Sequence, residues 1–185
     1  LGIDGPVTLA VHDWGGMIGF GWALRDPSRV KRLVITNTAS FPLPQSKRFP
    51  KRLAMGRDSR LGGWLIRRFN LFALGAAWFG TERALPKDVR AAFAGIYDGW
   101  DRAISTLRFM QDIPLDASDR AMPLVQAAAA ALPGYADRPV FIGWGLKDFV
   151  FDRHFLAGFR AALPIAEVHA FEDANHYVLE DKHEV

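Results

Sequence analysis

The stretch that decides the fold is Val7-Thr8-Leu9-Ala10-Val11-His12-Asp13-Trp14-Gly15-Gly16. Residues 7–11 are apolar and rich in β-branched side chains, which is typical of a short buried strand. The pair Gly15-Gly16 allows backbone to pack closely against backbone where a helix begins. The apolar run 17–24 predicts that this helix is buried. The sequence therefore places an acidic side chain, Asp13, at a sharp turn from strand to helix.

This turn resembles the nucleophile elbow of the α/β-hydrolases, with Asp13 where the common version has Ser. An elbow holds its side chain above the sheet, and the N–H groups of the following helix favour a negative charge there. An ionised carboxylate needs no base to become a nucleophile. On the turn alone, the alternative that Asp13 only caps the helix stays open.

Composition limits the class of protein. The 185 residues are 50% hydrophobic, with 14 Phe and 6 Trp, which is typical of a globular chain with a sizeable core. The absence of cysteine excludes disulfide and thiol chemistry and fits a reducing compartment, so we expect a cytoplasmic protein. The formal net charge of +3 is too small to indicate a nucleic acid partner.

The two ends indicate a piece of a longer protein. Leu1 stands directly before a core strand, and Val185 lies in a predicted helix. A strand as apolar as residues 7–11 needs neighbours on both sides. We therefore expect an α/β-hydrolase fold, a parallel sheet core with an inserted helical lid, whose N-terminal strands and C-terminal helix are missing from this sequence.

The order of elements predicts a cap inserted into the core. Residues 30–36 form a second apolar strand, so the chain begins with a right-handed βαβ unit. From residue 42 helical periods replace strands, over 64–79, 86–93, 100–110 and 123–132. We interpret 42–134 as a helical cap between core parts 1–41 and 135–185.

The cap contains two groups of residues with a functional interpretation. Its aromatic side chains, Trp78 and Phe109 among them, are predicted to line an apolar substrate pocket, and the alternative is that they only form the core of the cap. The second group is a basic amphipathic stretch, for which we weigh contact with an anionic membrane surface or an acidic partner against a merely solvated face. This stretch contains a single acidic residue, Asp58, and the basic residues Lys47, Arg48, Lys51, Arg52, Arg57, Arg60, Arg67 and Arg68.

Three polar residues each follow a core strand. Asp148 follows the apolar strand 139–145, and His176 follows the short strand 166–171. Asp13, Asp148 and His176 stand in the α/β-hydrolase order of nucleophile, acid and base. Parallel strands bring the three loops to one edge of the sheet. In this arrangement Asp13 forms an ester, His176 activates water and Asp148 orients the imidazole.

Several neighbouring residues need an interpretation. Trp14 is predicted to bind substrate, with its backbone and indole N–H groups facing an anion or a carbonyl oxygen. Asp152 is a rival to Asp148 as the acid, and His12 is interpreted as packing. No Asp or Glu occurs between Asn37 and Arg57, so an acid after the second strand is absent. The remaining histidines show no convergent pattern, and we predict neither a metal nor a cofactor.

A family resemblance rests on three motifs: Val11-His12-Asp13-Trp14-Gly15-Gly16, the segment 144–151 and Asp173-Ala174-Asn175-His176-Tyr177. With them the sequence resembles haloalkane dehalogenases and their relatives. Segments 20–24, 34–39, 104–114 and 173–181 are more similar to OleB-type β-lactone decarboxylases of bacterial olefin synthesis.

The resemblance to β-lactone decarboxylases implies a specific reaction. Enzymes of that family convert a cis-β-lactone with two long alkyl arms to a cis-alkene and CO2, without a cofactor, in an assembly with a β-lactone synthetase and a reductase. The alternatives are a haloalkane dehalogenase, an epoxide hydrolase or a non-catalytic protein of hydrolase fold. The epoxide hydrolase ranks lower because it needs two cap tyrosines, and only Tyr97 lies well inside the cap.

Overall fold

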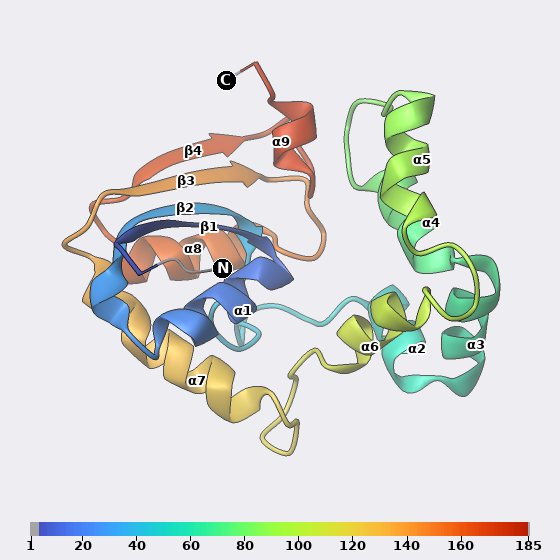
Figure 1. Ribbon diagram of the computed structural model, residues 1–185, viewed down its shortest axis with the longest axis horizontal. Helices are drawn as coiled ribbons and strands as arrows, with labels where there is room; N and C mark the ends of the chain where they lie inside the picture. The colour runs from blue at the N-terminus through green and yellow to red at the C-terminus, as the bar shows by residue number, and fades with distance from the viewer. Residues whose placement is uncertain (1–3, 185) are drawn as a thin grey trace.

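A computed structural model describes residues 4–184 as a parallel sheet with helices on one face and a cap beyond the carboxyl ends of its strands (Figure 1). The strands are β1 Val7–Asp13, β2 Val30–Thr38, β3 Val140–Gly145 and β4 Glu167–Phe171. The α-helices are α1 Trp14–Ala23, α2 Lys51–Asp58, α3 Arg60–Phe69, α4 Leu71–Phe79, α5 Lys87–Gly95, α6 Ile104–Gln111, α7 Met122–Ala131, α8 Arg153–Ala162 and α9 Val178–Asp181. Two 3-10 turns lie at Pro27–Arg29 and Leu132–Tyr135.

The four strands pair in the order β1-β2-β3-β4, and every pair is parallel. Ile35 of β2 pairs with Val11 on one side and with Ile142 on the other, and Ile142 in turn pairs with Val168. This register aligns the carboxyl ends of the strands, so the loops that follow β1, β3 and β4 leave from one edge of the sheet. The predicted parallel sheet is confirmed.

The main core lies between the sheet and α1, α7 and α8, which cover the same face (Figure 1). Phe20 of α1, Leu132 after α7 and Phe159 of α8 are each at most 1% exposed and belong to one apolar cluster. Trp144 of β3 is fully buried in this cluster, and its indole N–H donates to the Phe151 carbonyl at 2.8 Å. The loop after β3 is thereby anchored to the core.

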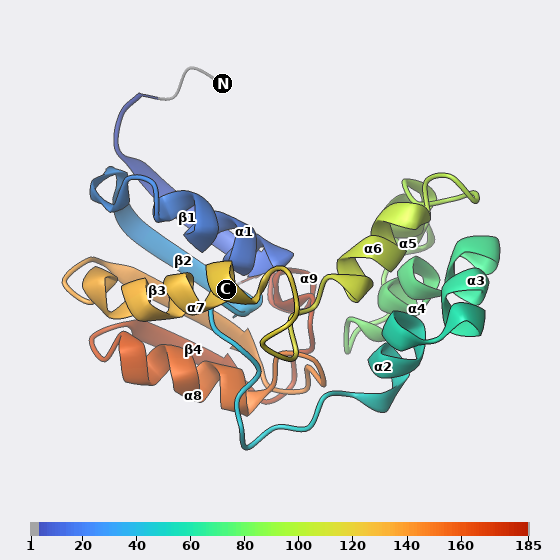
Figure 2. The same ribbon diagram turned by 90° about the horizontal axis from the view of Figure 1, so that it is seen from below.

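Helices α2 to α6 form the cap, which Figure 2 shows to one side of the sheet, beyond the strand ends. The cap has its own small apolar cluster of Leu53, Ile66, Leu107 and Met110. The predicted division into 1–41, 42–134 and 135–185 stays a prediction. Within it, α7 packs against α1, and Ala128 of α7 belongs to the main core, although the division assigns this helix to the cap.

The single helical period predicted over 64–79 is wrong in detail, because the structure has two helices there. Asn70 separates α3 from α4 with φ 51° and ψ 33°, a left-handed conformation that Asn tolerates better than most residues. The predicted helix at 100–110 begins later, at Ile104, after Gly99 with φ 90°. In both cases the helical pattern of apolar side chains runs on through a residue whose backbone conformation ends or delays the helix.

Residues 4–184 contain neither a membrane-spanning helix nor a cluster of metal ligands. No helix in this range combines the length and the apolar character that a membrane crossing requires. The same range has no group of three His, Asp or Glu side chains arranged to hold a metal ion.

Candidate active site

The turn between β1 and α1 has the strained geometry of an elbow. Asp13 has φ 48° and ψ −125°, a region that costs a non-glycine residue about 1–3 kcal/mol. Contacts across the turn hold this conformation: the Thr38 hydroxyl donates to the Asp13 carbonyl and accepts the Gly16 N–H. A side chain at Gly16 would collide with Thr38 and the Ala39 backbone, so the close approach requires glycine.

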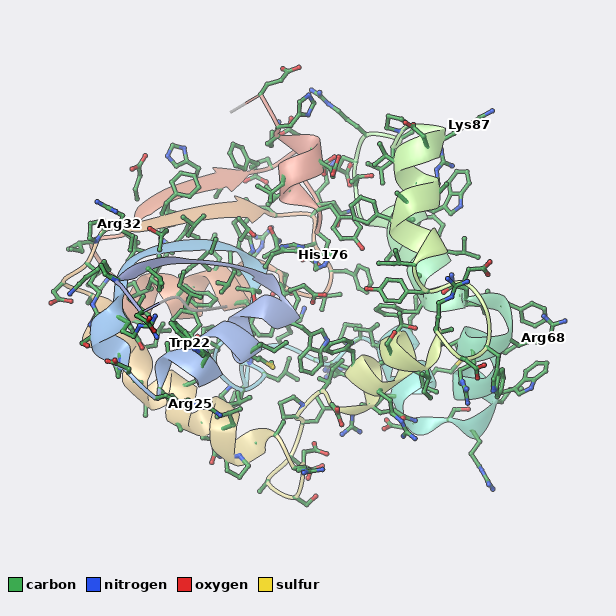
Figure 3. All side chains as sticks on the ribbon, viewed as in Figure 1. Trp22, Arg25, Arg32, Arg68, Lys87 and His176 are labelled. Atoms are coloured by element: carbon green, nitrogen blue, oxygen red, sulfur yellow. The ribbon has the colours of Figure 1, made fainter. Side chains whose placement is uncertain are left out.

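The structure brings the three predicted site residues together at the carboxyl edge of the sheet. His176 Nδ1 lies 2.8 Å from Asp148 Oδ2, which is a hydrogen bond. Its other ring nitrogen, Nε2, lies 4.0 Å from Asp13 Oδ2. Figure 3 shows His176 at the strand ends, facing the side on which the cap lies. The imidazole therefore stands between a buried carboxylate and the carboxylate on the elbow.

Asp148 is the buried member of this group, with a fully buried side chain. Its Oδ1 accepts the Val150 backbone N–H at 2.7 Å, and its Oδ2 accepts the Asn37 side-chain amide at 3.1 Å as well as contacting His176. A carboxylate with these donors is fixed in orientation and has its charge compensated. It can hold one imidazole nitrogen in place while the other faces Asp13.

Asn37 is the residue that sequence reasoning missed. It occupies the end of β2, where the sequence lacks an acid, and is fully buried. Its side chain bonds to both backbone groups of Gly145 and to Asp148. A polar residue after an otherwise apolar strand was the available signal, because a buried amide needs partners.

The charges in the site shift the pKa values of both reacting groups. Burial opposes the cation of His176, but the hydrogen bond to Asp148 and the two carboxylates outweigh it and raise the pKa of this imidazole. Burial also raises the pKa of Asp13, while His176 and the Trp14 backbone N–H lower it. Solvent reaches 43% of the Asp13 side chain and weakens the effect of burial, so we expect a carboxylate at neutral pH.

His12 packs as predicted, but it packs directly against the candidate base. Its ring centroid lies 4.7 Å from that of His176, and its Nδ1 lies 3.2 Å from the Thr36 hydroxyl. Burial and then the charge of His176 lower the pKa of His12 to about 4. His12 is therefore a neutral ring beneath His176 at physiological pH.

Of the aromatic residues predicted to bind substrate, Trp14 and Phe109 meet at the site, with ring centroids 5.3 Å apart. Phe109 comes from α6, so this pair brings a cap side chain next to the elbow. Trp78 lies elsewhere: the Arg90 guanidinium stands 3.7 Å above its ring, and the side chain is 60% exposed. The pocket role of Trp78 stays a prediction that these contacts do not support.

The rival acid Asp152 is engaged away from the imidazole of His176. Its carboxylate pairs with Lys47 at 2.6 Å and caps α8 by accepting the His154 backbone N–H. Lys47 belongs to the basic stretch of the cap, and so does Arg57, which pairs with Asp119 at 2.9 Å. Lys47 and Arg57 therefore form ion pairs within the protein that join segments far apart in sequence.

The fold and the site together define the class of protein. The sequence pattern of the alpha/beta hydrolase fold matches residues 1–183, and the chain belongs to this family. It is similar to the cis-3-alkyl-4-alkyloxetan-2-one decarboxylase of Xanthomonas campestris pv. campestris, with 65% identity over 100% of this chain and 62% of the relative. Similarity to the protein of that name in Shewanella oneidensis is 50% identity over 98% of this chain and 57% of the relative.

A solved structure supports the same fold. The haloalkane dehalogenase DatA from Agrobacterium tumefaciens C58 matches with a TM-score of 0.82 at 19% identity, over 97% of this chain and 63% of that one. The chain thus spans about three fifths of the length of the relatives that it matches. The predicted α/β-hydrolase fold and the resemblance to β-lactone decarboxylases are confirmed.

Proposed function

We propose that the protein containing this chain is a cis-β-lactone decarboxylase with Asp13 as nucleophile, His176 as its charged partner and Asp148 as the acid that orients His176. The 65% identity to a relative of that name over the whole chain is the observation that carries the substrate class. The geometry supports the roles, because a carboxylate on a strained elbow faces an imidazole that a buried carboxylate holds.

The reaction balances with the residues of the site alone. In the first step Asp13 attacks the ring carbon that bears the lactone oxygen, and the ring C–O bond breaks to release a carboxylate on the adjacent carbon. In the second step this carboxylate leaves as CO2. The electrons of its C–C bond form the double bond and expel Asp13 as a free carboxylate. Inversion followed by anti loss gives a cis-alkene from a cis-lactone, and no water is consumed.

His176 supplies positive charge in this scheme. Its raised pKa favours the imidazolium, which lies between the carboxylates of Asp148 and Asp13. When the lactone opens, the newly released substrate carboxylate needs a cation in a partly dehydrated site. The Trp14–Phe109 pair offers apolar surface for an alkyl arm, and each CH2 buried contributes about 0.8 kcal/mol.

A single turnover in H2(18)O tests the scheme. We expect alkene and CO2 with no label in the peptide that contains Asp13, because no water attacks the ester. Mass spectrometry of the peptide and gas chromatography of the alkene give the two readouts. The Asp13→Asn variant is the control and should yield neither product. Label in the Asp13 carboxylate, or loss of lactone without alkene, contradicts the proposal.

Haloalkane dehalogenation is the second candidate, and Trp14 is the observation that favours it. An indole N–H beside the nucleophile suits a departing halide, and His176 would then activate the water that cleaves the ester. Parallel assays with a β-lactone and a long-chain bromoalkane separate the two. Bromide release without lactone consumption favours this candidate.

The expected partners stay predictions. The olefin-pathway assembly with a β-lactone synthetase and a reductase follows from the family resemblance. Contact of the basic cap stretch with an anionic membrane is testable by sedimentation with vesicles of phosphatidylglycerol, with phosphatidylcholine vesicles as the control. Figure 3 shows Arg68 of this stretch at the side of the cap remote from His176.

A further inference from the structure

The buried carboxylate of Asp181 joins two segments that are far apart in sequence. Asp181, at the end of α9, is 2% exposed. It accepts the backbone N–H groups of Glu82 at 3.0 and 3.1 Å, Arg83 at 3.1 Å and Asn175 at 2.8 Å. The first two belong to the α4–α5 connection of the cap, and Asn175 directly precedes His176. Figure 1 shows this connection on the side of the cap that faces α9.

Hydrogen bonds on both sides of His176 join the same two segments. The Asn175 side chain accepts the His176 N–H at 2.8 Å and donates to the Phe79 carbonyl at 3.2 Å. The N–H of Tyr177 donates to the Gly80 carbonyl at 2.8 Å. The loop that carries the imidazole is therefore bonded to the end of α4 immediately before and immediately after His176.

The cap segment 79–83 packs closely against the loop that carries His176. A Cβ at Gly80 would lie 2.6 Å from the ring of Tyr177, so this ring packs against the Gly80 backbone as closely as glycine permits. Glu82 of the same segment pairs with Lys147 at 2.6 Å, and Lys147 is adjacent to Asp148. The cap segment 79–83 thus contacts both loops that carry the acid and the imidazole.

We propose that Asp181 is a positioning residue that ties the His176 loop to cap segment 79–83, so that the imidazole reaches Asp13 only while the cap is docked. The effect on catalysis rests on the proposed function, whereas the coupling itself does not. A carboxylate can accept all three N–H groups, but an amide cannot, because its NH2 group would face a donor. The Asp181→Asn change therefore places a donor against one of these N–H groups and loosens the tie between the cap segment and the His176 loop with almost no change in volume.

The experiment compares Asp181→Asn with Asp173→Asn in the full-length protein. Asp173 is a suitable control because it lies on the same loop, its side chain is 71% exposed, and within residues 4–184 its carboxylate forms its ion pair with Lys182 at 2.6 Å. For Asp181→Asn we expect kcat to fall at least about tenfold with KM nearly unchanged, because misplacement of about 1 Å can cost a hundredfold. Asp173→Asn should retain the wild-type values.

A second readout needs no substrate. Amide hydrogen exchange at Glu82, Arg83 and Asn175 should accelerate in Asp181→Asn, while strand β2 keeps its protection. The proton resonance of the His176–Asp148 hydrogen bond should broaden or shift. Wild-type kcat, or equal loss of protection in β2, overturns the proposal. Wild-type protein that fails to consume lactone refutes the proposed function only, because selective exchange still reports the coupling.

A second variant covers the case in which Asp181→Asn does not fold. Asn175→Ala removes the side-chain bonds to His176, Phe79 and Glu82 but leaves the Asp181 carboxylate in place. It should reproduce the fall in kcat and the faster exchange at Arg83. If exchange in segment 79–83 does not respond to this change, the cap and the His176 loop are not coupled and the proposal fails.

Discussion

The side-chain amide of Asn37 donates to Asp148 Oδ2 at 3.1 Å, and the same oxygen lies 2.8 Å from His176 Nδ1. The other atom of the amide group, Oδ1, accepts the Gly145 N–H at 2.8 Å. Asn37 therefore fixes the candidate acid relative to β3, although it comes from the neighbouring strand.

The Asn37→Ala variant should lose both stability and turnover. It leaves the Gly145 N–H without its partner, so we expect the free energy of unfolding to fall by about 2–3 kcal/mol and kcat to fall about tenfold. Urea titration and steady-state kinetics measure the two effects. Ser40→Ala is the matched control, because Ser40 is buried nearby in sequence and its hydroxyl has no hydrogen-bond partner within residues 4–184. Equal effects of the two changes would refute the role of Asn37.

Replacement of Asp13 should abolish turnover without unfolding the protein. Asp13→Asn keeps the shape of the side chain and removes the nucleophilic carboxylate, so we expect kcat to fall at least about 10⁴-fold. Circular dichroism should show an unchanged spectrum and a melting temperature at or above that of the wild type, since burial disfavours the charge at this position. Residual activity near the wild-type level would exclude Asp13 as the nucleophile.

The pH dependence of turnover separates the two candidate reactions. The pKa of His176 is raised, so a reaction that uses the imidazolium loses activity as the pH rises through that value. A hydrolytic reaction uses the neutral imidazole and gains activity over the same range. We expect the falling limb with a β-lactone. Profiles of kcat against pH between about 5 and 10 decide the sign, and a rising limb would contradict the role proposed for His176.

Acid should destabilise the fold through His12. Because its pKa is lowered from 6.5 to about 4, the unfolded chain binds a proton between these values that the folded protein does not. The free energy of unfolding therefore falls as the pH falls through this window, by about 3 kcal/mol in total. In His12→Phe this contribution should vanish, measured by urea titration at pH 7 and pH 4. His183→Gln, at a 62% exposed histidine, is the control and should keep the wild-type slope.

The two cap aromatics should differ in their effect on substrate binding. Phe109 contacts Trp14 at the elbow, so Phe109→Ala should raise KM for a long-chain lactone about tenfold, the effect of about 1.4 kcal/mol of lost contact. Trp78→Ala should change KM less than about twofold, because its ring packs under Arg90. A larger rise in KM for Trp78→Ala than for Phe109→Ala would indicate that Trp78 lines the pocket and that substrate binds near α4.

The sequence predicts the parts of the site that depend on strand order. Asp13, Asp148 and His176 follow apolar strands, and parallel strands end at one edge, so their convergence follows from the pattern alone. The placement of Asp148 rather than Asp152 needs the structure, because both acids lie in one loop and only packing decides which one faces inward.

The parts that escape prediction depend on contacts between distant segments. Trp78 and Phe109 have the same chemical character in the sequence, and only the orientation of α4 and α6 separates their surroundings. Asp181 looks like one more acid of a charged C-terminal segment, yet it accepts bonds from residues 98 and 99 positions away. Likewise, apolar periodicity does not reveal that Asn70 breaks a helix through its backbone conformation.

The apolar cluster within the cap has an evolutionary consequence. An insertion that carries its own core can be exchanged between homologues by recombination at the connections after β2 and before α7 without altering strand register. Such an exchange would change the substrate range and leave Asp13, Asp148 and His176 in place. The exchanged cap must contain a 79–83 segment that fits the loops of the core. Activity of chimaeras made with and without the native 79–83 segment therefore measures how far the cap and the core depend on each other.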